Sequence, residues 1–417
     1  MNASLITIGN EVLNGQVVDT NAAWIAQELL SLGISVKEKW SVADEMNTIV
    51  EALERSHGKA DVIITTGGLG PTADDLTCEA LAQWMQVERL FHEDTWQKMI
   101  KIFASFNRAP TESHKIQCML PAGVTILSNA FGTAPGMYFH YKQKHVISLP
   151  GVPFEMKGIF DPYVKKLLES VKSGPRRKSH TFNTAGEGET FLEDQIREIT
   201  SKAPDCISFA YLPDIYKVRI RVDLDSDRPE DLDIYQEVLD AIRLKLKIYI
   251  VGENETTLEL AIGNILKLKG WMLGIAESCT GGYISHLITS NAGSSEYFQG
   301  SIISYAYELK ENLLGVRHQT LETFGAVSEE TVIEMAQGAL RTMNVQVSIS
   351  ISGIAGPGGG TKDKPVGLIW LAIADHTGRV ITKKINRNRD RLLNIKAAAN
   401  MALITLYRFI SDAGLEA

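Results

Sequence analysis

A serine and a cysteine in the C-terminal third of the chain could act as nucleophiles. Ser278 and Cys279 follow the strand-like run Trp271–Ala276 and precede a predicted helix over 283–290. A hydroxyl or thiol at a strand-to-helix turn is exposed at the sheet edge and lies near the positive end of the helix. The thiol is intrinsically the better nucleophile, because a small fraction of it is thiolate at neutral pH. Chemistry alone therefore favours Cys279 slightly, although a free cysteine is often just a small buried apolar residue.

A serine nucleophile needs a base, and Lys310 is the candidate. A lysine that is desolvated in a pocket can lose its proton and act as that base. Tyr305 and Lys310 would point about 140° apart on one continuous helix, so they converge only if Tyr305 ends a strand and Lys310 lies on the next helix. The alternative is that Lys310 is an ordinary solvated helix lysine.

Two glycine-rich turns could bind anions. The first, Gly67-Gly68-Leu69-Gly70-Pro71, follows the strand-like run Asp61–Thr66, and the second, Gly353–Gly360, follows Val345–Ile351. Glycine lets the backbone approach a ligand closely, and exposed backbone N–H groups bind phosphate or an oxyanion. The second turn could equally be a mobile connector, above all at Gly358 to Gly360.

Adjacent carboxylates follow the first of these turns. Asp74 and Asp75 would repel an anionic ligand unless a divalent cation lay between them, so the combination predicts Mg²⁺ or a similar hard metal. The alternative for Asp75 is a helix-capping role together with Thr72. Glu11 and Asp44 follow other predicted strands at the same sheet edge, where open α/β sheets bind ligands, although either could be an ordinary surface acid.

The elements that position these residues predict a chain of several domains. A length of 417 residues suggests two to four domains at about 100 to 200 residues each. Strands alternate with helices in the first and last parts of the chain, whereas the middle reads strand, helix, two strands, helix, strand. We therefore predict two α/β domains with mainly parallel sheets, 1–172 and 256–417, joined by a small α+β domain, 178–253. The basic, Gly- and Pro-containing stretch 172–178 is the predicted linker.

Composition excludes several classes of protein. The net charge of −8 gives no long-range attraction to nucleic acid or anionic lipid. The apolar runs are shorter than the ~20 residues of a membrane helix, and the first residues do not resemble a signal peptide. The four cysteines form no CxxC pair and the histidines form no HExxH motif, so thiolate and histidine metal sites have little support. We expect a soluble, cytoplasmic protein.

Five separated motifs in the first domain carry a resemblance to a known family. They are IGNEVLNG from Ile8, Asp19-Thr20-Asn21, TTGGLGPTADD from Thr65, GTAPG from Gly132 and LPGVP from Leu149. In this order they resemble the N-terminal domain of the CinA (competence/damage-inducible) family, which is similar in fold to molybdopterin-binding proteins.

The resemblance implies hydrolysis of the pyrophosphate of ADP-ribose to AMP and ribose 5-phosphate, with a divalent metal (Mg²⁺, Mn²⁺ or Co²⁺) and potassium. It implies that Glu11, Asp44, Asp74 and Asp75 hold metal or position water. The substrate-binding residues that it implies are Gly9, Asn10, Asn21, Gly67, Gly68, Gly70, Pro71, Thr72, Gly136 and Pro150.

The last domain resembles the C-terminal CinA domain, the nicotinamide mononucleotide deamidase called PncC. The motifs are ESCTGG, SYAYELK, GAVSEE, SISGIAGPGGG and KPVG. The resemblance implies hydrolysis to nicotinate mononucleotide and ammonia without a cofactor, with Ser278 as nucleophile, Lys310 as base and Tyr305 as a polarising or relay group. It reverses the chemical preference for Cys279. The substrate-binding residues that it implies are Glu277, Cys279, Thr280, Gly281, Gly282, Ser352, Gly353, Ile354, Ala355, Gly356 and Arg389.

One motif departs from the family pattern. The family has a Gly-Asp-Arg run with another arginine about four residues later. Here the run reads Arg387-Asn388-Arg389-Asp390-Arg391, and the later position, counted from Arg389, is Leu393. Arg389 can still pair with the substrate phosphate.

Together the two resemblances predict a bifunctional enzyme of pyridine nucleotide salvage, which family analogy makes a homodimer. One alternative is a DNA-related adaptor without catalysis, seated on the middle domain, whose element order is loosely similar to a KH module. The turn that would have to clamp nucleic acid, Ala185–Glu189, is acidic and spaced GxG rather than GxxG. The other alternative is a molybdopterin-binding enzyme, which fold similarity alone suggests.

Overall fold

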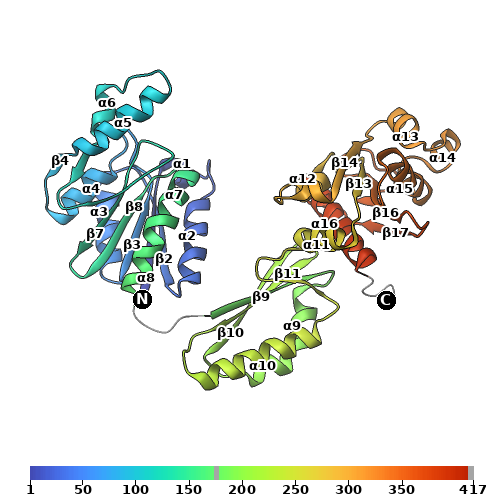
Figure 1. Cartoon of the computed structure of the whole chain (residues 1–417), viewed down its shortest axis with the longest axis horizontal. Helices are drawn as coiled ribbons and strands as arrows, with labels where there is room; N and C mark the ends of the chain where they lie inside the picture. The colour runs from blue at the N-terminus through green and yellow to red at the C-terminus, as the bar shows by residue number, and fades with distance from the viewer. Residues whose placement is uncertain (173–177, 412–417) are drawn as a thin grey trace. The chain divides into compact units, whose positions relative to one another are not determined.

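The computed structural model describes residues 1–172 and 178–411. The chain divides into two compact units, Met1–Lys178 with Asp225–Arg228, and Ser179–Leu224 with Pro229–Ala417 (Figure 1). Residues 173–177 of the predicted linker lie outside the described residues. The second unit contains both the predicted α+β domain and the predicted third domain, each with a sheet of its own.

The first unit is built on one mixed sheet in the order β2-β1-β3-β8-β7-β6. The first four strands of that order run parallel, whereas β7 and β6 are antiparallel to their neighbours. The strands are β1 Asn2–Ile8, β2 Ser35–Val42, β3 Val62–Thr66, β6 Thr125–Leu127, β7 Gly136–Tyr141 and β8 Lys144–Leu149. The parallel part therefore brings the carboxyl ends of β1, β2, β3 and β8 to one edge, as predicted for a ligand site.

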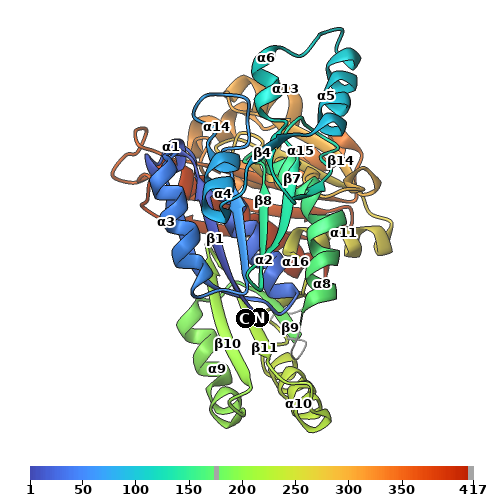
Figure 2. The same ribbon diagram turned by 90° about the vertical axis from the view of Figure 1, so that its left-hand side faces the viewer.

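Helices cover both faces of this sheet, and each face has its own apolar core. One core is closed by α2 Thr20–Ser31, α7 Pro153–Ile159, a π-helical segment Phe160–Val164 and α8 Lys165–Val171. The other is closed by α3 Met46–His57 and α4 Thr77–Met85 (Figure 2). Smaller elements complete the unit: α1 Asn10–Leu13, α5 Glu93–Ser105, α6 Glu112–Ile116 and the paired strands β4 Arg89–Phe91 and β5 Met119–Pro121.

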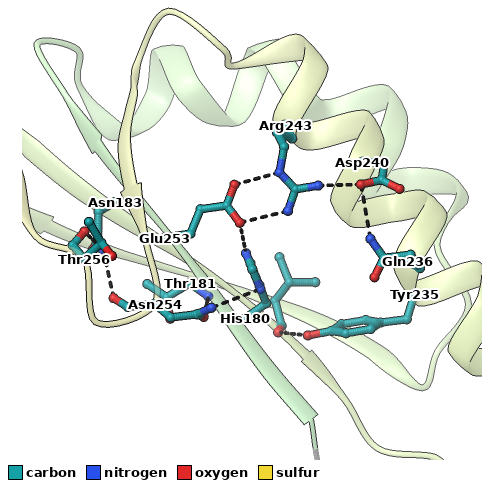
Figure 3. A network of polar contacts seen from close by, with 11 residues as sticks. His180, Thr181, Asn183, Tyr235, Gln236, Asp240, Arg243, Glu253, Asn254 and Thr256 are labelled. Atoms are coloured by element: carbon teal, nitrogen blue, oxygen red, sulfur yellow. Dashed lines mark hydrogen bonds and ion pairs between the residues drawn. The ribbon is translucent and has the colours of Figure 1, made fainter. Parts of the chain in front are cut away.

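The second unit begins with a four-stranded sheet in the order β10-β11-β9-β12. The predicted sequence of strand, helix, two strands, helix and strand is confirmed: β9 Lys178–Ala185, α9 Glu189–Lys202, β10 Ile207–Asp214, β11 Lys217–Leu224, α10 Pro229–Lys245 and β12 Ile250–Glu253. Glu253 links three of these elements, because it accepts hydrogen bonds from Arg243 at 2.7 and 2.8 Å and lies 2.7 Å from Nε2 of His180 (Figure 3).

The second sheet of this unit has five strands in the order β14-β13-β15-β16-β17. The strands are β13 Leu273–Glu277, β14 Phe298–Ile303, β15 Val347–Gly353, β16 Leu368–Asp375 and β17 Val380–Asn386. β13 lies parallel between β14 and β15, and the remaining pairs are antiparallel. The sheet is thus mixed, and its parallel half places the ends of β13, β14 and β15 side by side.

Helices again cover both faces. The larger core lies under α11 Leu258–Lys269, α12 Tyr283–Thr289 and α16 Arg391–Ile410. The opposite face is covered by α13 Tyr307–Leu314, α14 His318–Phe324 and α15 Glu329–Met343. Within residues 1–172 and 178–411, no helix combines the length and the hydropathy that crossing a membrane requires.

The packing of α15 gives a stability prediction. Alanine normally stabilises a helix relative to glycine by about 1 kcal/mol, but a Cβ on Gly338 would lie 1.9 Å from the carbonyl oxygen of Leu314. The added Cβ can be accommodated only if the backbone at Leu314 or Gly338 moves, so we expect Gly338→Ala to lower the free energy of unfolding. Gln337→Ala, at the exposed neighbouring position, should unfold with a free energy close to that of the wild type. Urea unfolding of both variants measures the difference, and a stabilised Gly338→Ala would contradict this packing.

Candidate functional site

The end of β13 carries the predicted nucleophile, and α13 carries the predicted base. Glu277 of β13 pairs with Ile303 of β14, so the residues that follow these strands emerge together at the sheet edge. Nζ of Lys310 lies 3.2 Å from Oγ of Ser278. The structure therefore brings the two side chains together, with Tyr305 just beyond the strand and Lys310 on the following helix.

Lys310 is removed from water. Its side chain is only 1% exposed, and Nζ donates to the carbonyl oxygens of Ser304 at 2.6 Å and Tyr305 at 3.3 Å. Burial lowers the pKa of Lys310 to about 8. The alternative of a solvated helix lysine is thus wrong. A neutral amine has two N–H donors and one lone pair, so donation to both carbonyls leaves the lone pair for the hydroxyl of Ser278.

Cys279 is placed in a different environment from Ser278. The thiol is buried, and burial raises the pKa of Cys279 to about 12. A thiol with that pKa carries almost no thiolate near neutral pH. Burial thus counts against the preference for Cys279 that intrinsic reactivity gave, because the raised pKa leaves little thiolate to attack a substrate.

Glu277 organises the turn between β13 and α12. Its carboxylate is fully buried and accepts five hydrogen bonds, from N–H groups of Gly282, Ile284 and Ser285 and from hydroxyls of Thr280 and Ser285. Gly281 and Gly282 have φ of 60° and 98°, a region that side chains rarely adopt. These residues were expected to bind substrate, but the acceptor capacity of Glu277 is used up by these five hydrogen bonds, and Glu277 instead fixes the backbone that carries Ser278.

A cavity of about 190 Å³ lies over Ser278 and Lys310. Its lining is Ser278, Cys279, Tyr305, Lys310, Ala326, Val327, Ser352, Gly353, Ala355 and Arg391. Of these, Ala326, Val327 and Arg391 were not among the predicted site residues, although Ala326 and Val327 belong to the GAVSEE motif. Among the predicted ones, Thr280, Gly281, Gly282, Ile354 and Gly356 do not line it.

Tyr305 lies at the rim of this cavity. Its side chain is 62% exposed, and its hydroxyl lies 3.4 Å from Arg391. The contact of Tyr305 with Lys310 comes from its backbone carbonyl. Among the described residues, the phenol makes no hydrogen bond with Ser278 or with the amine of Lys310, so no contact supports its predicted relay role.

The arginine at this site is Arg391 rather than Arg389. Arg391 donates to the carbonyl oxygen of Gly356 at 2.7 Å and lines both the small cavity and a neighbouring cavity of about 690 Å³. Arg389 lines only the neighbouring cavity, beside the glycine loop Pro357–Gly360. The expected phosphate partner Arg389 is thus outside the small cavity, and Arg391 is the arginine that lines it.

The first unit has its own cavity of about 570 Å³ at the carboxyl edge of the parallel strands. The predicted residues that line it are Gly9, Glu11, Asn21, Asp44, Gly67, Gly68, Gly70, Pro71, Asp74, Asp75 and Pro150. Gly67 must be glycine, since its φ is 100° and a Cβ would lie 2.1 Å from the carbonyl oxygen of Ile8.

Three predicted residues do not line this cavity. The backbone N–H of Asn10 donates to Asp44 at 2.9 Å. Thr72 donates through its N–H and its hydroxyl to Asp75. This contact stabilises the turn but does not cap α4, which begins at Thr77 with Leu76 at its N-cap, so the helix-capping alternative for Asp75 is wrong. Gly136 is a packing residue, because a Cβ there would lie 2.9 Å from the side chain of Ile159.

The acids of this cavity influence one another. Burial raises the pKa of Asp44, and the neighbouring charges of Glu11, Asp74 and Asp75 raise it further. A bound cation would relieve that repulsion. Among the described residues, however, no three Asp, Glu, His or Cys side chains converge as metal ligands. A cation at this cavity would therefore have to be held by one or two of these carboxylates with substrate phosphates as further ligands, an arrangement that protein sites often use for Mg²⁺.

Two acids of the cavity were not predicted. Asp19 caps α2 through the N–H of Ala22 and accepts from the hydroxyl of Thr7 at 2.7 Å, and Glu155 accepts from Asn129 at 2.6 Å. Asp19 could have been identified from the sequence, because it is the first residue of the Asp-Thr-Asn motif. Buried atoms Oδ1 of Asn21 and Oγ1 of Thr66 have no hydrogen-bond partner in the described structure, so both remain free for a ligand or water.

Comparison with known proteins identifies relatives for each part of the chain. Residues 255–410 match the family model "CinA C-terminal domain", and residues 4–170 match "Probable molybdopterin binding domain". The predicted likeness of the first domain to molybdopterin-binding proteins is thereby confirmed at the level of fold.

Full-length relatives cover nearly the whole chain. A CinA-like protein of Cytophaga hutchinsonii is 38% identical over 97% of both chains. A putative competence-damage inducible protein of Halothermothrix orenii is 38% identical, covering 98% of this chain and 99% of the relative. Among solved structures, the competence/damage inducible protein CihA from Agrobacterium tumefaciens is 39% identical over 36% of this chain and 91% of its own, with a TM-score of 0.35.

The buried lysine gives a pH prediction that needs no substrate. Only the neutral amine can accept the proton of Ser278, so we expect the rate at which a sulfonyl fluoride labels Ser278 to rise with pH and to level off above about 8. Mass spectrometry of the labelled peptide gives the rate, and Lys310→Met, the control, should abolish the rise. A labelling rate that is the same below and above about pH 8 would show that Lys310 is not the base.

Proposed function

This chain belongs to the CinA family, and from that membership we propose that it is a bifunctional hydrolase of pyridine nucleotide salvage. The second unit would convert nicotinamide mononucleotide to nicotinate mononucleotide and ammonia. The first unit would convert ADP-ribose to AMP and ribose 5-phosphate. The observation that carries the proposal is the desolvated Lys310 amine 3.2 Å from the hydroxyl of Ser278.

The two neighbouring cavities suit the two ends of nicotinamide mononucleotide. The smaller, over Ser278, would take the nicotinamide ring, while the larger, lined by the glycine loop and Arg389, would take the ribose phosphate. Arg391 lines both, so its guanidinium lies where it can pair with the phosphate. Family resemblance supplies the substrate, and the paired cavities support it.

The residues of the small cavity suffice for an acyl-transfer mechanism. Oγ of Ser278 attacks the carboxamide carbon while Lys310 takes its proton. Lys310 then gives that proton to the departing nitrogen, so that ammonia leaves and an ester with Ser278 remains. A water molecule attacks the ester, Lys310 accepts the water's proton and returns it to Ser278, and nicotinate mononucleotide is released.

The pyrophosphatase site would work through electrostatics and positioning. A divalent cation, when bound, would neutralise pyrophosphate charge and polarise the phosphorus–oxygen bond. Asp44 and Asp74, with Glu11 nearby, are the carboxylates that would hold it, since a hydrogen bond from Thr72 lowers the pKa of Asp74 and so favours its charged form. The N–H groups of Gly68 to Gly70 would bind the phosphates, because the N–H of Gly67 already donates to the carbonyl oxygen of Leu149.

A second candidate for the first unit is binding of a molybdopterin. The family model matched by residues 4–170 favours it. The six acids along the cavity, Glu11, Asp19, Asp44, Asp74, Asp75 and Glu155, argue for a cation with its ligand. The acidic turn at Gly186 to Gly188 likewise weighs against the DNA adaptor.

The choice of nucleophile is tested by a pair of neighbouring variants. Ser278→Ala should abolish ammonia release from nicotinamide mononucleotide, with a loss of at least about a thousandfold, because no other group can form the ester. Cys279→Ala should keep most of the activity. An enzyme-coupled ammonia assay measures both, and a dead cysteine variant beside an active serine variant would assign the nucleophile to Cys279.

The acidic cavity is tested separately. We expect Asp74→Asn to remove most metal-dependent AMP formation from ADP-ribose, since it removes one carboxylate charge from a cation site, and to leave ammonia release unchanged. Chromatography of the products with and without chelator is the measurement. Asp161→Asn, an exposed acid outside the cavity, is the control. Unchanged AMP formation in Asp74→Asn would exclude Asp74 from the site.

A further inference from the structure

A lysine outside the cavities ties two walls of the Ser278 cavity together. Nζ of Lys364 donates to the carbonyl oxygen of Phe324 and, at 2.8 Å, to that of Val327. These carbonyls bracket the turn 324–327 between α14 and α15, which we call the wall turn. Ala326 and Val327 of the wall turn line the small cavity, whereas Lys364 itself does not.

The wall turn is held from two sides. On one side the N–H of Ala326 donates to the hydroxyl of Tyr307 at 3.3 Å, and Tyr307 begins α13, the helix that carries Lys310. On the other side Lys364 reaches it from the loop after β15, which also supplies Ala355 to the cavity. Two segments that line the cavity are therefore linked through one ammonium group.

Lys364 is built into its position. Its backbone N–H donates to the hydroxyl of Thr361 at 3.0 Å, and its carbonyl accepts from the N–H of Thr361 at 2.8 Å. These two hydrogen bonds hold the segment from Thr361 to Lys364 as a tight turn. Gly325 leaves room for the ammonium, since a Cβ there would lie 3.2 Å from Nζ. A cation that binds carbonyls at the end of a helix, here α14, is also favoured by the helix dipole.

We propose that Lys364 is a positioning residue that fixes the width of the small cavity and so sets the affinity for the substrate, an inference that rests on the proposed deamidase. Without the ammonium, the carbonyls of Phe324 and Val327 lose their shared donor and the wall turn loosens. Because Lys364 contacts neither Ser278 nor Lys310, the dyad keeps its geometry. Binding of the ring is then weakened while the chemical step is retained.

The test compares Lys364→Met with Lys362→Met. Lys362 is exposed in the same loop, and no hydrogen bond or ion pair of its side chain occurs among the described residues. Lys362→Met therefore removes the same positive charge as Lys364→Met without removing a contact. We expect Lys364→Met to raise KM for nicotinamide mononucleotide about tenfold or more with kcat within about twofold. Sulfonyl fluoride labelling of Ser278 should be unchanged, and amide hydrogen exchange of 324–328 should be faster than in Lys362→Met.

Two results would overturn the inference. One is an equal KM and equal exchange in the two lysine variants. The other is a loss of Ser278 labelling in proportion to activity, which would mean that the fold of the unit rather than the cavity had been damaged. If the unaltered protein released no ammonia, the proposed deamidase would fail, and the exchange of 324–328 would still decide whether Lys364 holds the wall turn.

Discussion

The exclusion of water from one amine is the constraint on which the C-terminal site depends. The pKa of Lys310 falls from 10.5 to about 8, so burial disfavours its charged form by about 3 kcal/mol relative to water. Such a cost persists only where the surrounding fold fixes the side chain. Here α13 leaves the sheet directly after β14, and the carbonyls of Ser304 and Tyr305 bind the amine.

The same sheet edge gives the two candidate nucleophiles, Ser278 and Cys279, different contacts. The hydroxyl of Ser278 lies 3.2 Å from Nζ of Lys310, whereas Cys279 lines the small cavity and also belongs to the apolar core. Glu277 acts on the turn that carries both side chains. Its carboxylate accepts hydrogen bonds from the N–H groups at the start of α12 that have no partner within the helix, and so fixes the backbone of the turn.

Local features of the fold and site could be predicted from the sequence. Strand-to-helix turns rich in glycine are short-range patterns, so the positions of Ser278 and of the turn after β3 followed from them. The sequence could not show which of Arg387, Arg389 and Arg391 lines the small cavity. Side chains of an extended segment alternate between its two sides, so these three arginines would all lie on the same side. It is the capping of α16 by Asp390 that turns the chain and brings Arg391 to the glycine loop. Likewise the wall turn reaches the cavity only through tertiary packing.

The two sites differ in how much of their chemistry the protein supplies alone. Around Ser278 the amine of Lys310, the turn held by Glu277 and the guanidinium of Arg391 all have protein contacts. In the first unit the carboxylates repel one another, and Asn21 and Thr66 keep buried oxygen atoms without partners among the described residues. Buried polar groups without partners cost free energy that a ligand can recover. Under the proposed function, the acidic cavity would need a cation and substrate to offset this repulsion, whereas the serine site already holds its base beside the hydroxyl.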